Sequence, residues 1–405
     1  MELFVARQPI FDLNTKVVAY EMLYRSGATN GFDGADSDVA TSKVINAVFY
    51  SPEGAQLLNQ KTAFVNFPQG LLVNDAALAI PPRNTVIEIL ETVEPTPEVI
   101  SACKRLRSKN YKLALDDIID SEREHPLAEF ANFIKVDFLQ AGRDECARIA
   151  NRYKKGDNLI AEKVETEDDF LWALDHGFSY FQGYFFAKPV TSRVSDIPGF
   201  KLNFLEILKR IHEPEMNFQE LASLIKREPS LSYKVLRAAN SALYGTRQPA
   251  RSVEHAMMRV GENEIRKLLS VIVMIDLASD APNEVTVSAL LRARFAELLA
   301  FGAGLGSRSG ELFTLGLFSR LDVLIGRPIK DLIDGIELSE DVRTALLNPA
   351  ANDTTVSKLW STVLAYEIGN WDEASPLLHE IKLHSEIAHS LYSAAVYWAD
   401  TVFHP

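Results

Sequence analysis

In the first 190 residues or so, short β-rich runs alternate with helical segments, and this alternation limits the possible folds more than any other feature. The β-rich runs are LFVARQPIFD, VVAYEMLYR, TAFVNF, TVIEILE, YKLALDD, NFIKVD, NLIAEKV and FSYFQGYFF. Stretches between the later runs, such as TPEVISACKRLRSKN, carry apolar residues at helical spacing. Such an alternation forms a mainly parallel sheet, and this number of strands predicts a closed (β/α)8 barrel.

The connection between the first two runs differs from the others. DLNTK, residues 12–16, is short and polar, as expected of a hairpin turn. Because a hairpin joins antiparallel strands, we expect a modified TIM-type barrel with one antiparallel strand at its start.

The pattern changes after AKPVTSRVSDIPGF, whose Pro, Ser and Asp residues are typical of a linker. Helical segments follow one another from about residue 200 to the end. One begins at Asn217, a good N-cap, and the next begins with Pro229 and ends at Gly245. We therefore predict a barrel over residues 1–192, a linker over 193–202 and an all-helical domain over 203–405.

Composition excludes several classes of partner. The formal net charge of −13 disfavours nonspecific binding to nucleic acid or to an anionic membrane, because like charges repel. Cys103 and Cys146 are the only cysteines, so neither a disulfide framework nor a cysteine metal site is expected. The longest apolar run, SVIVMIDLA, is too short to span a bilayer, and the chain does not open with a cleavable signal. We expect a cytoplasmic protein.

Polar side chains recur near the ends of the predicted strands, where the catalytic groups of such barrels gather. Asp116 and Asp117 are adjacent at the end of one run. Such a pair is common in turns, but it is also typical of a metal site, where a cation removes the repulsion. The full set is Glu21, Asn66, Glu88, Asp116, Asp117, Lys135, Asp137, Glu162, Glu165 and Gln182. Together their oxygens suit hard divalent cations, which could orient a water molecule against a phosphate ester.

These motifs resemble the EAL domain, the phosphodiesterase that linearises the bacterial second messenger cyclic di-GMP. The resemblance covers about residues 1–190, including an E-x-L-x-R motif and the closing QGYFFAKP. It implies metal ligands at Glu21, Asn66, Glu88, Asp116 and Asp117, with Mg²⁺ or Mn²⁺ as cofactor if the site is competent. It also implies catalytic roles for Lys135, Glu162 and Glu165, and substrate contacts from Leu23, Arg25 and Gln182.

The sequence departs from the EAL pattern at several positions. Met22 replaces the signature alanine, and Pro68 replaces a serine. Ile118 and Ile119 stand where the family has Phe and Gly after its Asp pair, and Lys163 replaces the glycine of E-G-V-E. Because β-branched residues disfavour positive φ, we expect the loop after Asp117 to differ from that of the family.

The second half resembles the HDOD domain, a helical signalling module related to HD-type metal phosphohydrolases. Ser319 and Arg320 stand where the enzymes carry a His-Asp pair, so we expect no metal in this half. His379, His384 and His389 recur at every fifth residue, which spreads them around a helix. The polar stretch around Asn240 is interpreted as a helix C-terminus rather than a nucleotide site.

These observations favour a regulator in cyclic di-GMP signalling, with a degenerate EAL domain coupled to a protein-interaction module. An active phosphodiesterase and a scaffold that binds no nucleotide are the alternatives. The expected partners are cyclic di-GMP, a signalling protein bound through the HDOD half and a second copy of the chain.

Overall fold

The computed structural model describes residues 3–26, 38, 41–42, 45–50, 58, 61–120, 125–153, 159–183, 199–241, 249–278, 282–351 and 354–403. The chain divides into two compact units. The first comprises Met1–Lys188 with Leu364–Pro376 and His384–Tyr397, and the second comprises the remaining residues. Most of the predicted linker lies outside the described residues, so the predicted domain boundaries stay a prediction.

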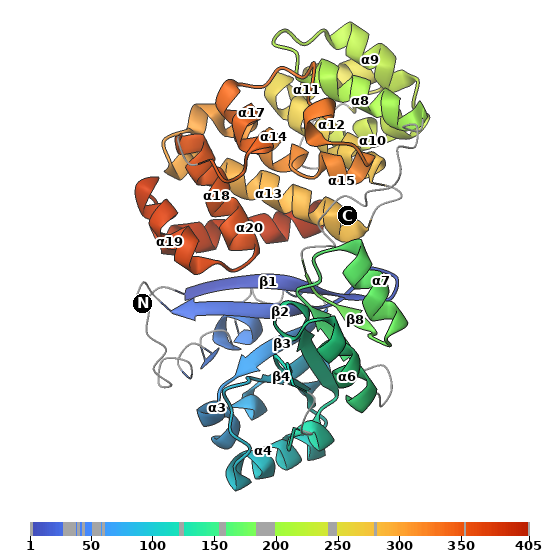
Figure 1. Cartoon of the computed structure of the whole chain (residues 1–405). Coiled ribbons are helices and arrows are strands. Elements are labelled where there is room, and N and C mark those ends of the chain that lie inside the picture. Colours follow the sequence, from blue (N-terminus) through green and yellow to red (C-terminus); the bar gives the residue numbers. More distant parts are fainter. Residues whose placement is uncertain are drawn as a thin grey trace. The chain divides into compact units, whose positions relative to one another are not determined.

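The first unit contains a closed barrel whose strands follow one another in chain order (Figure 1). The strands are β1 (Leu3–Asp12), β2 (Val17–Ser26), β3 (Thr62–Phe67), β4 (Thr85–Ile89), β5 (Lys112–Leu115), β6 (Phe133–Asp137), β7 (Leu159–Glu162) and β8 (Tyr180–Phe181). Strand β1 is antiparallel to both of its neighbours, β2 and β8, and all other pairs are parallel. The predicted TIM-type barrel with one antiparallel strand is therefore confirmed.

The turn between β1 and β2 is stabilised by Asp12. Its Oδ1 accepts hydrogen bonds from the backbone N–H groups of Asn14 at 2.8 Å and Lys16 at 2.9 Å. Thr15 adopts a left-handed φ of 56° within this turn. The carboxylate therefore closes the hairpin that the DLNTK sequence predicts.

Helices connect the later strands, as the alternating pattern predicts. They are α3 (Gln69–Val73), α4 (Pro97–Ser108), α5 (Phe138–Ala141), α6 (Arg143–Tyr153) and α7 (Glu167–Asp175). Thr96 caps α4 by accepting a hydrogen bond from the backbone of Val99. Buried Val99, Cys103 and Leu106 form its apolar face.

An apolar cluster contributed by six of the strands fills part of the barrel. Its buried members are Ile10, Ala19, Phe64, Val86, Ala114 and Ile160. Phe133 and Tyr180 pack against this cluster, and the ring of Phe133 lies 5.4 Å from that of Phe64 and 5.7 Å from that of Tyr180. The barrel interior is thus a packed core, and ligands have access only at its ends.

Helices joined by turns make up the described part of the second unit, which contains no strand, and this confirms the all-helical prediction. The helices beyond the barrel are α8 (Gly199–Ile211), α9 (Phe218–Lys226), α10 (Pro229–Ala239), α11 (Val253–Val260), α12 (Glu262–Leu277), α13 (Asn283–Gly302), α14 (Ser309–Phe318), α15 (Leu321–Ile325), α16 (Ile329–Leu332), α17 (Glu340–Leu347), α18 (Thr355–Glu367), α19 (Trp371–Glu380) and α20 (Ser385–Phe403). Parts of the last three belong to the first compact unit.

Two helix ends in this half can be compared with the sequence. Asn217 caps α9 as predicted, with its side chain accepting from the N–H groups of Gln219 and Glu220. Helix α10 ends at Ala239, earlier than the predicted Gly245, which lies outside the described residues. Asn240 ends the helix because its amide exchanges two hydrogen bonds with the backbone of Ala250.

Helices α13 and α14 approach each other closely at Gly316. A Cβ atom at this position would lie 2.4 Å from the backbone nitrogen of Ala293. The glycine therefore permits a backbone contact that any side chain would prevent.

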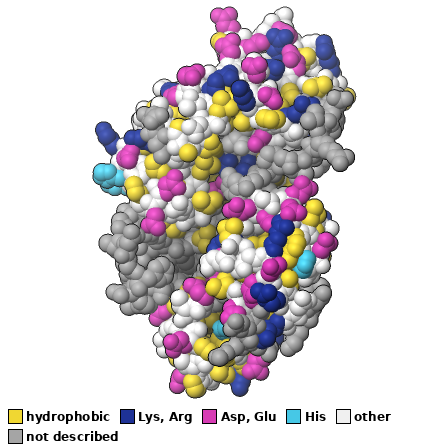
Figure 2. All heavy atoms as spheres, viewed as in Figure 1, with side chains coloured by type: hydrophobic (Ala, Val, Ile, Leu, Met, Phe, Trp, Pro, Cys, Tyr) yellow, Lys and Arg dark blue, Asp and Glu magenta, His cyan; other side chains and the backbone are white. Residues whose placement is uncertain are grey.

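Acidic and basic side chains are interspersed over the described part of the face in Figure 2, in keeping with the net charge of −13. Among the described residues, no helix combines the length and the apolar character that a membrane span needs.

Candidate functional site

A polar layer lies directly beyond the apolar layer of the barrel. Alternate residues of a strand face the same side, so the residue two positions after an inward apolar residue also faces inward. The pairs of apolar and polar residues are Ala19 and Glu21, Phe64 and Asn66, Val86 and Glu88, Ala114 and Asp116, Phe133 and Lys135, Ile160 and Glu162, and Tyr180 and Gln182. The period of the strands thus brings seven of the predicted site residues together.

Lys135 lies at the centre of this layer and is only 1% exposed. Its ammonium is 2.8 Å from a carboxylate oxygen of Glu162, 3.0 Å from one of Asp116 and 3.2 Å from one of Glu21. It also forms an ion pair with the fully buried Glu88. Four carboxyl groups therefore face a single buried ammonium.

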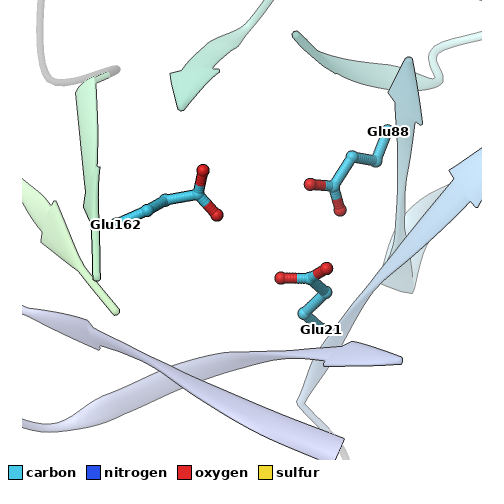
Figure 3. A group of neighbouring side chains, drawn as sticks. All are labelled: Glu21, Glu88 and Glu162. Carbon is cyan, nitrogen blue, oxygen red and sulfur yellow. The ribbon is translucent and has the colours of Figure 1, made fainter. Parts of the chain in front are cut away.

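Three of these carboxyl groups point toward a common centre (Figure 3). Each of Glu21, Glu88 and Glu162 offers an oxygen within 4.8 Å of those of the other two. Glu21 is held by amide donors, because Gln182 Nε2 donates to its Oε2 at 2.8 Å and Asn66 Nδ2 donates to its Oε1 at 3.4 Å. The amides turn their own oxygens elsewhere as a result.

Four buried oxygen atoms of this layer have no hydrogen-bond partner among the described residues. They are Asn66 Oδ1, Glu88 Oε2, Glu162 Oε2 and Gln182 Oε1. A buried oxygen without a partner is costly unless a cation or a donor satisfies it. The donor set, carboxylates with amides, is the one that Mg²⁺ and Mn²⁺ prefer. The residues present therefore fit a divalent cation.

The crowding of carboxyl groups changes their protonation. Burial, reinforced by the charge of Glu21, raises the pKa of Glu88 well above its ordinary range. Burial also raises the pKa of Glu162, to about 8, against the opposing effect of Lys135. Burial alone would lower the pKa of Lys135, but the surrounding carboxylates raise it well above its ordinary value. The ammonium stays charged, whereas some carboxyl groups hold protons until a further positive charge arrives.

A second group of carboxylates lies beside the first and includes one residue that the sequence analysis missed. Oxygens of Glu91, Asp116 and Asp117 lie within 4.8 Å of one another. Glu91 is exposed just beyond β4, three residues after Glu88. In the sequence, the only indication that Glu91 belongs to the site is its place at the end of the TVIEILE run.

The loop after β5 has an unusual backbone at Asp117. This residue adopts a left-handed φ of 43°, whereas Ile118 and Ile119 do not have positive φ. The N–H of Ile118 donates to the carbonyl of Lys135 at 3.0 Å, which fastens the loop to β6. The left-handed position thus falls on Asp, which tolerates it better than Ile.

A pocket of about 280 Å³ opens beside the second carboxylate group. Its lining includes Glu91, Asp116, Asp117, His125 and Tyr153. Burial lowers the pKa of His125. A molecule bound in this pocket would therefore meet carboxylates and the imidazole of His125, which favours its neutral form.

The remaining predicted residues lie less centrally. Glu165 is exposed beyond the end of β7 and belongs to neither carboxylate group. Leu23 is half-buried on β2, and the side chain of Arg25 lies outside the described side chains. Met22, the bulky replacement beside Glu21, is buried on β2, which places it one residue out of the inward register.

In the helical half, Ser319 and Arg320 take part in hydrogen bonds between helices. Ser319 Oγ donates to the carbonyl of Gly316 at 2.7 Å and accepts from Arg292 at 3.1 Å, and Arg320 Nε donates to Ser288 at 3.3 Å. Burial lowers the pKa of His389 to about 4. That this half binds no metal stays a prediction.

Comparison with known proteins gives two family matches. The family model described as the EAL domain matches residues 51–189, and that of the HDOD domain matches residues 197–329. YuxH, an uncharacterized protein of Bacillus subtilis, is 33% identical over 407 residues, with 98% of each chain covered. CdgJ of Vibrio cholerae, a cyclic di-GMP phosphodiesterase, is 31% identical over 347 residues, covering 85% of this chain and 80% of CdgJ.

Solved structures are also similar. The crystal structure of an EAL domain protein from Listeria monocytogenes is 17% identical, with a TM-score of 0.37. The match covers 46% of this chain and 87% of that protein.

Proposed function

We propose that this chain, which belongs to the family of proteins that join an EAL domain to an HDOD domain, is a divalent-cation-dependent phosphodiesterase that hydrolyses cyclic di-GMP to the linear dinucleotide. One observation carries the proposal. The polar layer that contains the buried Lys135 has four buried oxygens without a partner among the described residues, and a cation would satisfy them. This proposal ranks above the degenerate regulator because seven site residues converge in one layer.

Glu21, Asn66, Glu88 and Asp116 would hold the first cation, and Asp117 a second. When bound, divalent cations lower the pKa of a water molecule and offset the negative charge of a phosphate. The residues fit this role because Asn66 and Glu88 each keep a buried oxygen without a partner among the described residues, while amide donors fix the orientation of Glu21. Mg²⁺ and Mn²⁺ both suit the donors.

The other side chains of the polar layer would balance charge, transfer protons and bind the nucleotide. Lys135, which stays charged, orients the carboxylates and balances their charge. Burial raises the pKa of Glu162 to about 8 in the cation-free site, and a bound cation would lower it again, so that the ionised carboxylate would then accept the proton of the attacking water. The water oxygen bonds to phosphorus, the bond from phosphorus to the ribose O3′ breaks, and O3′ takes up a proton. Leu23, Arg25 and Gln182 would contact the nucleotide, and Glu165 would assist from the loop beyond β7.

A second candidate is the regulator that binds cyclic di-GMP without hydrolysing it and signals through a protein bound to the HDOD half. The left-handed backbone at Asp117 and the lysine at position 163 favour it, because both alter the neighbourhood of the second cation. A homodimer is compatible with either function.

The test is hydrolysis of cyclic di-GMP by the full-length protein with Mn²⁺, followed by chromatography of the linear product. We expect turnover that Glu21→Gln lowers at least about a hundredfold, because the substitution removes a cation ligand while keeping its shape. Glu98→Gln, an exposed carboxylate on α4, is the matched control and should keep wild-type turnover. Nucleotide binding by calorimetry without turnover would favour the regulator, and neither binding nor turnover would favour the scaffold.

A further inference from the structure

Lys163 holds a backbone conformation that lysine disfavours. It directly follows Glu162 at the end of β7 and has a left-handed φ of 53°. A left-handed conformation is strained for a residue with a side chain, whereas glycine adopts it freely. Lysine at this position is therefore less stable than glycine would be, but it places a long cationic side chain at the polar end of the barrel.

The ammonium of Lys163 is directed to a buried carboxylate. Its Nζ donates to Asp137 Oδ2, and Asp137 has no exposed surface. Asp137 uses its other oxygen to cap α5, accepting from Leu139 at 2.8 Å and Gln140 at 3.0 Å. Because Asp137 pairs in register with Glu162 across β6 and β7, this ion pair lies at the same rim as the carboxylate layer.

The same ammonium acts on Asp117. Lys163 pairs with Asp137 at the end of β6, and the N–H of Ile118, the residue after Asp117, donates to the carbonyl of Lys135 on the same strand at 3.0 Å. The loop that carries Asp117 is therefore fastened to the strand whose end Lys163 contacts. The carboxylates of Asp137, Asp117 and Glu162 raise the pKa of Lys163 against the effect of burial, so its ammonium stays charged. Lys163 is therefore a positive charge near Asp117, which with Glu91 and Asp116 forms the second carboxylate group.

We propose that Lys163 is a tethered cation that weakens the binding of a second divalent ion at Asp117, so that the barrel holds one ion tightly and a second only at high concentration. This inference rests on the proposed cation site of the barrel. The side chain is 46% exposed, so water screens its charge and the effect is moderate. We expect the second ion to bind about tenfold more tightly once the charge is removed.

The test counts Mn²⁺ bound to the full-length protein by electron paramagnetic resonance, which needs no turnover. Lys163→Gly and Lys163→Gln should both gain a second tight Mn²⁺, because both remove the charge. Lys163→Arg should behave like the wild type. Lys382→Gly is the matched control, since Lys382 is exposed and also left-handed, with a φ of 59°.

The outcomes separate this inference from the proposed function. One tight Mn²⁺ in the wild type and an identical isotherm in every variant would overturn the role of Lys163 and leave the cation site intact. A gain in Lys163→Gly without one in Lys163→Gln would show that backbone relief, not charge, controls the second ion, and would also overturn it. Failure of every variant to bind Mn²⁺ would overturn both proposals.

Discussion

Substituting Lys135 with methionine removes the one buried ammonium among four carboxyl groups and keeps most of the side-chain volume. Three of its ion pairs span 2.8–3.2 Å, and a fourth joins the fully buried Glu88. Removing one partner from a buried ion pair typically costs about 3–5 kcal/mol, because the other charge is left without compensation. Proton uptake by the carboxyl groups, favoured by burial at Glu88 and Glu162, limits the cost to that range.

We therefore expect Lys135→Met to lower the free energy of unfolding of the barrel by about 3–5 kcal/mol at pH 8 in the presence of a chelator. Excess Mn²⁺ should raise the free energy of unfolding of Lys135→Met by more than it raises that of the wild type, since a bound cation replaces the missing charge. Urea unfolding followed by circular dichroism measures both quantities. Lys109→Met, on the exposed end of α4, is the control and should change little. Equal stability of Lys135→Met and the wild type in chelator would refute the electrostatic argument.

Two further predictions concern the backbone and pH. Gly183→Ala should lower the free energy of unfolding by at least about 2 kcal/mol, because its φ is 151° and a Cβ would lie 2.4 Å from the backbone of Val164. Urea unfolding measures this loss. Gly310→Ala is the control and should be near neutral, because a Cβ at that position meets nothing within 4 Å. Burial and the charge of Arg266 lower the pKa of His212 to about 4. The unfolded chain therefore binds a proton between pH 6.5 and 4 that the folded chain excludes, and stability should fall by up to roughly 3 kcal/mol over that interval. His212→Gln should flatten this slope in unfolding curves across that range, and an unchanged slope would contradict the assignment.

The fold was predictable from the sequence because two spacings of apolar residues dominate it, the alternation typical of strands and the spacing typical of helices. Strand alternation fixes both the core and the polar layer, since Phe64 and Asn66, or Phe133 and Lys135, are two residues apart on one strand. The helical half follows from its apolar spacing and from caps such as Asn217.

What the sequence did not predict depends on tertiary contacts. Glu91 is an ordinary exposed carboxylate until the loop after β5 brings Asp116 and Asp117 beside it. The ion pair of Lys163 with Asp137 requires the pairing of β6 with β7 and a left-handed backbone, neither of which local propensity reports. The early end of α10 depends on the contact of Asn240 with Ala250, ten residues away.

The measurement that tests the central claim most directly is anomalous diffraction from crystals of the full-length protein grown with Mn²⁺. We predict a strong manganese peak in ligand contact with Glu21, Asn66, Glu88 and Asp116, in the polar layer where Asn66 and Glu88 have buried oxygens without partners among the described residues. A weaker peak beside Asp117 should strengthen in Lys163→Gln. Crystals at saturating Mn²⁺ with no peak at the first position would contradict the account.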